Sequence, residues 1–127
     1  MSKRIVIVDD SIFLIKQLTA FFEVAMGYKV VATGSDGNAA VALFREHKPD
    51  LITLDITMPN KDGMQALAEI MGEFPDANVM MISAIRGQEM TQCIRLGAKG
   101  YMEKPLLFND EQFVRDFKAS LGEVFED

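Results

Sequence analysis

Three features are scarce or absent in this sequence, and each scarcity excludes a class of protein. The chain has one cysteine, Cys93, so an intramolecular disulfide is impossible and a reducing compartment fits. The longest apolar runs are far shorter than a membrane span, and residues 1–4 lead into a predicted strand rather than a secretory signal. We therefore expect a cytoplasmic protein that does not insert into a membrane.

Basic residues are also scarce relative to acidic ones. Thirteen lysines and arginines stand against nineteen aspartates and glutamates, which gives a net charge of −6. Direct binding to the phosphate backbone of nucleic acid requires a basic surface, and no cluster of lysine or arginine supplies one. The composition therefore argues against direct nucleic-acid binding.

No linker or low-complexity stretch interrupts the 127 residues, a length typical of one domain, so we expect residues 1–127 to form a single domain. Apolar runs of strand length alternate with segments of helical period, which is typical of βα units. The predicted strands are residues 4–8, 29–32, 51–55, 79–82 and 100–103. The predicted helices run from after Asp10 to Met26, with Gly27 at C′, from Ser35 or Asp36 to about 47, from about 64 to 73, from about 88 to 96, and from near Asn109, with Gln112 completing a capping box.

The number and character of these units predict an α/β fold. Five strands cannot close an eight-stranded barrel, and strands as uniformly apolar as residues 51–54 must be covered on both faces. We therefore expect a doubly wound, five-stranded parallel sheet with helices on both faces. Right-handed crossovers leave few topologies, among them the flavodoxin-like strand order 2-1-3-4-5.

Polar residues follow the predicted strands where each one ends. Asp9 and Asp10 follow the first strand and Asp55 closes the third, and these two strands are neighbours at the switch point in the order 2-1-3-4-5. Three converging carboxylates raise one another's pKa or require a cation. Oxygen-only ligands favour Mg²⁺ over zinc. Ser83 and Lys104 end the fourth and fifth strands and are expected beside the acids.

Each of these residues also has a simpler interpretation. The acids at 9–10 could favour a helix dipole, and Lys104 could pair with Glu103 on the surface. Ser83 could cap the next loop, and Tyr101 could be a core residue of an edge strand. The joint placement of these side chains at strand ends favours a functional site.

Six short motifs carry a resemblance to a known family. They are Val8-Asp9-Asp10-Ser11, Leu54-Asp55-Ile56-Thr57-Met58-Pro59, Asp62-Gly63, Ile82-Ser83-Ala84, Gly97-Ala98-Lys99-Gly100-Tyr101 and Lys104-Pro105. Together and in this order they resemble the receiver domain of bacterial response regulators, from the first strand to the last helix. The resemblance is strongest to stand-alone regulators of the chemotaxis type.

The resemblance implies a role for each site residue. Asp55 would accept a phosphoryl group from a phosphohistidine, with Mg²⁺ held by Asp9, Asp10, Asp55 and the backbone carbonyl of Thr57. A carboxylate nucleophile of this kind yields an acyl phosphate.

Three further residues match positions that respond to the phosphoryl group in the family. Ser83 and Lys104 would contact the phosphoryl oxygens. Tyr101 would turn in behind Ser83 and change the surface of the helix near 88–96, the strand 100–103 and the last helix. In the family the peptide bond before the residue that matches Pro105 is cis.

This interpretation makes the chain a regulator rather than an enzyme, catalysing only its own aspartyl phosphorylation and dephosphorylation. The donor would be a sensor histidine kinase or a phosphotransfer protein. Because the chain ends close to its last helix, with no room for an output domain, we expect it to act through a partner such as a flagellar motor component or another regulator. Phe13, off the buried stripe of the first helix, could dock a kinase helix or pack against the last helix.

Other functions remain open from the sequence. A phosphatase of the haloacid-dehalogenase kind also uses a strand-end aspartate, but it carries a second aspartate at the position of Thr57. A degenerate receiver that only binds partners is a second alternative. The chain could also be a receiver fragment of a larger regulator or a phosphorelay intermediate.

Overall fold

The computed structural model describes residues 2–126, which form one five-stranded parallel sheet in the order β2-β1-β3-β4-β5. This confirms the predicted fold and strand order. The strands are β1 (Arg4–Val8), β2 (Lys29–Gly34), β3 (Leu51–Leu54), β4 (Val79–Ser83) and β5 (Gly100–Glu103). The helices are α1 (Ile12–Ala20), the π-helix η1 (Phe21–Ala25), α2 (Gly37–His47), α3 (Gly63–Glu73), α4 (Gln88–Leu96) and α5 (Glu111–Phe125).

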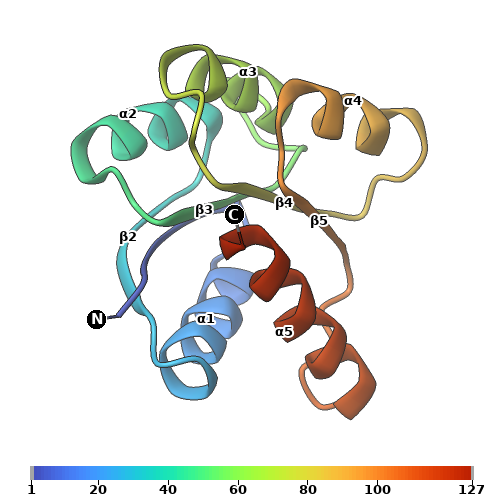
Figure 1. Cartoon of the computed structure of the whole chain (residues 1–127). Helices are drawn as coiled ribbons and strands as arrows, with labels where there is room; N and C mark the ends of the chain where they lie inside the picture. Colours follow the sequence, from blue (N-terminus) through green and yellow to red (C-terminus); the bar gives the residue numbers. More distant parts are fainter. Residues whose placement is uncertain (1, 127) are drawn as a thin grey trace.

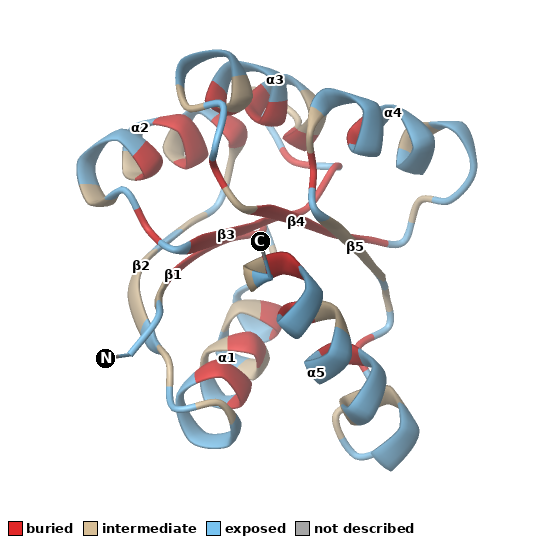
Figure 2. Cartoon of the chain, in the orientation of Figure 1, coloured by how far each residue is buried: buried red, intermediate tan, exposed pale blue. Residues whose placement is uncertain are grey.

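The helices form two layers around the sheet. Figure 1 shows α2, α3 and α4 on one face, with α1 and α5 on the other. The central strands β1, β3 and β4 are almost wholly buried, as Figure 2 shows, because both faces are covered. Within residues 2–126, none of the helices has both the length and the apolar character needed to cross a membrane.

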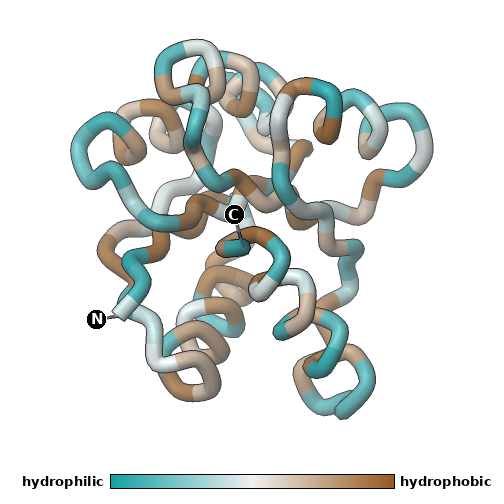
Figure 3. The backbone as a smooth tube through the Cα atoms, in the orientation of Figure 1, coloured by the Kyte–Doolittle hydropathy of each residue, from teal (hydrophilic) through white to brown (hydrophobic). Residues whose placement is uncertain are grey.

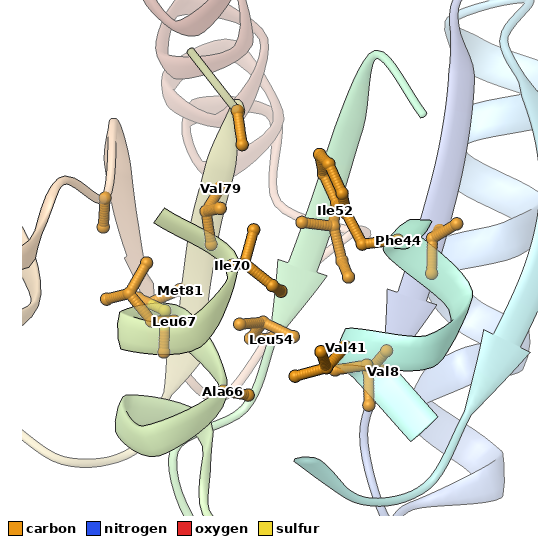
Figure 4. Close-up of a cluster of buried hydrophobic side chains, with 14 of the residues drawn as sticks. Val8, Val41, Phe44, Ile52, Leu54, Ala66, Leu67, Ile70, Val79 and Met81 are labelled. Atoms are coloured by element: carbon orange, nitrogen blue, oxygen red, sulfur yellow. The ribbon is translucent and has the colours of Figure 1, made fainter. Parts of the chain in front are cut away.

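Alternate residues of the central strands enter two separate cores. In β1 and β3, Val8 and Leu54 point toward α2 and α3, where they pack with Val41 and Leu67 (Figure 4). Residues of the other parity pack against α1 and α5 around a group of stacked and edge-on aromatic rings. In Figure 3 the hydrophobic segments lie along the sheet and on the sides of the helices that face it. Burial on both faces explains why these strands lack the alternation of a half-exposed sheet.

Most helix boundaries agree with the predictions. Asp36 caps α2 through a hydrogen bond from the Ala39 backbone N–H, 2.8 Å long. The first helix reaches the expected end at Met26, with Gly27 at φ +67° just beyond it, but its last turns form the π-helix η1 instead of continuing as an α-helix.

The predicted capping box at the last helix is wrong. Asp110, one residue after Asn109, caps α5 by accepting the backbone N–H groups of Gln112 and Phe113. The Gln112 side chain is engaged with Asp116 instead. A carboxylate that accepts two N–H groups is the stronger cap, which accounts for the shift by one residue.

Candidate functional site

The sheet register brings the strand-end acids together. Val8 and Leu54 are paired across β1 and β3, so Asp9 and Asp55 follow at the same level, and the Asp55 N–H donates to the Val8 carbonyl at 3.1 Å. Asp9 and Asp55 are 2% and 6% exposed, whereas Asp10 is exposed. One carboxylate oxygen from each of the three acids lies within 4.8 Å of the others. The predicted convergence is therefore present.

Lys104 reaches this cluster from the end of β5. Its Nζ lies 2.9 Å from Asp9 Oδ2 and 3.1 Å from Asp55 Oδ2. Glu103 pairs with Arg86 instead, at 2.9 Å, so the interpretation of Lys104 as a surface partner of Glu103 is wrong. The Lys104–Pro105 peptide bond is cis, as the resemblance implied.

Ser83 and Tyr101 both contact the peptide groups of Ile85, in the loop that follows β4. Ser83 is buried, and its Oγ accepts the Ile85 N–H at 3.1 Å. Ser83 therefore caps this loop, in agreement with the simpler interpretation of that residue. The Tyr101 hydroxyl donates to the Ile85 carbonyl. Tyr101 is therefore turned toward this loop, and one residue of the loop links the two side chains expected to act as a switch.

The negative charge of the buried acids is only partly neutralised by their surroundings. Desolvation, with the charge of Asp9, raises the pKa of the Asp55 carboxyl group, and the hydrogen bond and charge of Lys104 only partly oppose this. Burial disfavours the charged form of Lys104, but its hydrogen bond to Asp9 and the charges of Asp55 and Asp9 outweigh it and raise the lysine pKa. One lysine thus offsets part of the charge of three carboxylates.

This donor set fits a small divalent cation. The three carboxylates are close enough to share one ion, and oxygen-only ligands suit Mg²⁺. Thr57, two residues after Asp55, is exposed in the same loop. Ligation by its backbone carbonyl stays a prediction.

Close backbone contacts hold the loop that carries Asp55 to Asp62. The Gly63 N–H donates to the Ile56 carbonyl at 2.8 Å, and a Cβ atom on Gly63 would lie 1.9 Å from the Asp55 carbonyl oxygen. Only glycine permits this approach, which gives the Asp62-Gly63 motif a physical reason.

Comparison with known proteins places these residues in a family. The model of the response regulator receiver domain matches residues 5–115. The chain belongs to this family. This chain is similar to chemotaxis protein CheY of Thermotoga maritima. The two are 41% identical over 106 residues, which span 83% of this chain and 88% of that protein. CheY of Bacillus subtilis is 42% identical over the same shares of the two chains.

Solved structures agree with the sequence comparison. The CheX–CheY–BeF3–Mg²⁺ complex of Borrelia burgdorferi contains a chain that matches this receiver domain with a TM-score of 0.88 and 37% identity, over 98% of this chain and 90% of that chain. Family membership removes the haloacid-dehalogenase alternative. A receiver domain of this family is a regulatory domain.

Proposed function

We propose that this receiver domain is the phosphoacceptor of a two-component phosphorelay, modified on Asp55. The observation that carries the proposal is the convergence of Asp9, Asp10, Asp55 and Lys104 at the strand ends of a chain of this family. Asp55 is the nucleophile because it is the acid that directly follows β3, and its Oδ2 lies 3.1 Å from Lys104 Nζ, beside the carboxylate of Asp9. Residues 1–127 form one receiver domain in this proposal.

The transfer exchanges one bond to phosphorus for another. A carboxylate oxygen of Asp55 attacks the phosphorus of a phosphohistidine, the P–N bond breaks, and the imidazole leaves with the electron pair and takes up a proton. The carboxylates of Asp9, Asp10 and Asp55 and the carbonyl of Thr57 would hold Mg²⁺, which supplies positive charge to the phosphoryl oxygens.

The remaining site residues stabilise and report the modification. Lys104 exchanges part of its contact with Asp55 for a phosphoryl oxygen, and the Ser83 hydroxyl donates to another. Because Ser83 Oγ now accepts the Ile85 N–H, this new bond pulls on the loop whose carbonyl Tyr101 holds. The receiver domain catalyses only its own phosphorylation and dephosphorylation.

The output surface is formed by α4, β5 and α5. On α4, Met90, Ile94 and Leu96 are 37%, 49% and 40% exposed, and the Ile85 loop leads directly into that helix. An apolar surface next to the switch suits a partner whose affinity depends on phosphorylation. Similarity to CheY supports a chemotaxis role, with a flagellar motor component or another regulator as the partner.

A separate surface at the start of α1 suits the phosphodonor. Phe13 is 71% exposed, so it does not pack into the core beside α5, and Ile12 next to it is equally exposed. Ile12 and Phe13 stand two and three residues after Asp10. A helix of a histidine kinase or phosphotransfer protein that packs on them brings its phosphohistidine near Asp55. A receiver that is part of a larger regulator, or a relay intermediate, would use the same two surfaces.

Magnesium titration tests this proposal against a degenerate binding module. The melting temperature of the native protein is expected to rise with Mg²⁺, and Asp9→Asn and Asp10→Asn are expected to weaken the response. Asp76→Asn, an exposed acid in the turn before β4, is the matched control and should respond as the native protein does. A flat response from the native protein would favour the degenerate module.

A further inference from the structure

The carboxylate of Asp36 joins two segments that sequence reasoning did not connect. Asp36 Oδ1 accepts the Ala39 N–H at 2.8 Å and so caps α2, while Oδ2 accepts the Asn60 side-chain amide at 2.7 Å. Next to this contact, the Gly37 N–H donates to the Lys61 carbonyl at 2.8 Å. The start of α2 is therefore attached to the loop that carries Asp55.

That loop is held differently on its two sides. On the inner side, Ile56 and Met58 are buried in the core beneath α2 and α3. On the outer side, Pro59 and Asn60 are exposed, and Asn60 adopts φ +67°. The bond from Asn60 to Asp36 restrains this outer side, three residues after the Thr57 carbonyl.

The same segment that holds the loop also contacts a second site acid. The Asp9 N–H donates to the Gly34 carbonyl at 3.1 Å, two residues before Asp36. Residues 34–37 therefore contact Asp9 at one end and the Asp55 loop at the other. The close packing leaves no freedom at Gly37, where a Cβ atom would lie 2.3 Å from the Lys61 carbonyl oxygen.

We propose that Asp36 and Asn60 are a positioning pair that sets the Asp55 loop relative to Asp9, and with it the Mg²⁺ affinity and the rate of phosphoryl transfer to Asp55. This inference rests on the function proposed above. Neither side chain touches the reacting atoms. Their effect is geometric, because ligands on two loops bind one cation well only when the loops are held at the correct separation.

The hydrogen bond between Asn60 and Asp36 is a strong one, although it is exposed to solvent. A hydrogen bond to an ionised carboxylate is shorter and stronger than one between neutral groups. The bonds from Ala39 and Asn60 lower the pKa of Asp36, so the group is ionised across the neutral range. Asparagine is also among the few residues that adopt a positive φ readily, so the position suits its side chain and its backbone together.

Exchange of the two side chains tests the pair without changing the net charge. Asn60→Asp places two carboxylates against each other and is expected to push the loop away, lowering Mg²⁺ affinity and labelling rate by about fivefold, the equivalent of one ordinary hydrogen bond. The double variant Asp36→Asn with Asn60→Asp restores a carboxamide–carboxylate bond in the opposite direction. Asparagine also caps helices well, so α2 keeps its cap and both quantities should recover.

The charge added by Asn60→Asp makes the direction of the change in Mg²⁺ affinity informative. Another carboxylate near an acidic site should by itself attract Mg²⁺ more strongly, so a decrease can only come from displacement of the loop. Asn60→Gly, which keeps the positive φ and removes the amide, is expected to lower affinity by a smaller factor and replaces Asn60→Asp if that variant does not fold.

A matched control separates positioning from general stability. Glu73→Gln removes the charge from the ion pair of Glu73 with Arg45, 2.9 Å long, which also joins α2 to α3 but lies away from the Asp55 loop. It should leave Mg²⁺ affinity and labelling unchanged. Native-like affinity and rate in both Asn60 variants would overturn the positioning pair, as would failure of the double variant to recover. An absence of binding and labelling in the native protein would instead overturn the proposed function.

Discussion

Lys104 forms an ion pair with Asp55, its Nζ 3.1 Å from Oδ2, and the same nitrogen lies 2.9 Å from Asp9. The lysine thus reduces the repulsion between two carboxylates that are both almost fully buried. A cation bound among the acids would compensate the same charge. We therefore expect stability and Mg²⁺ binding to be coupled through Lys104.

Lys104→Met should destabilise the protein in the absence of Mg²⁺ by about 1–3 kcal/mol, because it leaves two buried carboxylates facing each other. Added Mg²⁺ should recover much of the loss. Lys99→Met is the control, since Lys99 is exposed and bonds to Asn78, and it should cost no more than about 0.5 kcal/mol. Denaturant unfolding with and without Mg²⁺ measures both. Equal losses, unaffected by the metal, would contradict the coupling.

The raised pKa of Asp55 predicts a pH-dependent advantage for Asp55→Asn. Burial and the charge of Asp9 raise this pKa in the folded state, so the stability that Asp55 contributes is present below its unfolded pKa of about 3.9 and is lost as pH rises through the folded pKa. Without Mg²⁺, the variant should melt about 3 °C above the native protein at pH 7 and close to it at pH 4. Saturating Mg²⁺ should reverse the order. A difference independent of pH would show that the Asp55 charge is not its cause.

Two glycines of α3 should respond in opposite ways to alanine. Gly63→Ala is expected to cost more than about 3 kcal/mol or to displace the Asp55 loop, because its Cβ would overlap the Asp55 carbonyl. At Gly72 no atom lies within 4 Å of a Cβ, so Gly72→Ala should stabilise the helix by about 0.5–1 kcal/mol. Thermal unfolding of the two variants checks the pair. A tolerated Gly63→Ala with normal Mg²⁺ binding would contradict the close approach.

Strand-end chemistry made most of the site predictable. In a parallel sheet the residues that follow neighbouring strands share one edge, so the order 2-1-3-4-5 was enough to place Asp9 and Asp55 together. The partner of Lys104 needed the structure, since Glu103 is its neighbour in the sequence whereas Asp55 is 49 residues away. Its true partners depend on the direction of a long side chain at the end of β5.

The contacts that escaped prediction have no periodic signal. Asp36 was recognised as a cap, but its second oxygen bonds to Asn60, 24 residues away in another loop. The last helix is capped by Asp110 rather than by Asn109, one residue earlier, and the first helix ends as a π-helix rather than as an α-helix. The spacing of apolar residues in the sequence fits both arrangements in each case. Such differences depend on tertiary packing rather than on local preference.

The lifetime of the phosphoryl group should depend on Thr57 and Ile85, the residues two positions after Asp55 and Ser83, whose side chains we expect to flank the approach of water to Asp55. Apolar Ile85 cannot orient a water molecule, and Thr57 lacks a carboxamide or carboxylate. Ile85→Ala should open the path and Thr57→Asn should align water, each shortening the half-life by roughly threefold, about 0.6 kcal/mol off the barrier. Loss of label after removal of the phosphodonor measures the rate. Decay equal to that of the native protein in both variants would show that other groups control access of water.

The site of phosphoryl transfer is the most direct test of the whole account. Native protein incubated with acetyl phosphate and Mg²⁺, then mapped by peptide mass spectrometry, should carry one phosphoryl group on Asp55 and none when Mg²⁺ is chelated. Asp55→Asn should remain unlabelled under the same conditions. Persistent labelling of that variant, on Asp9, Asp10 or a serine, would contradict the assignment of Asp55 as the phosphoacceptor.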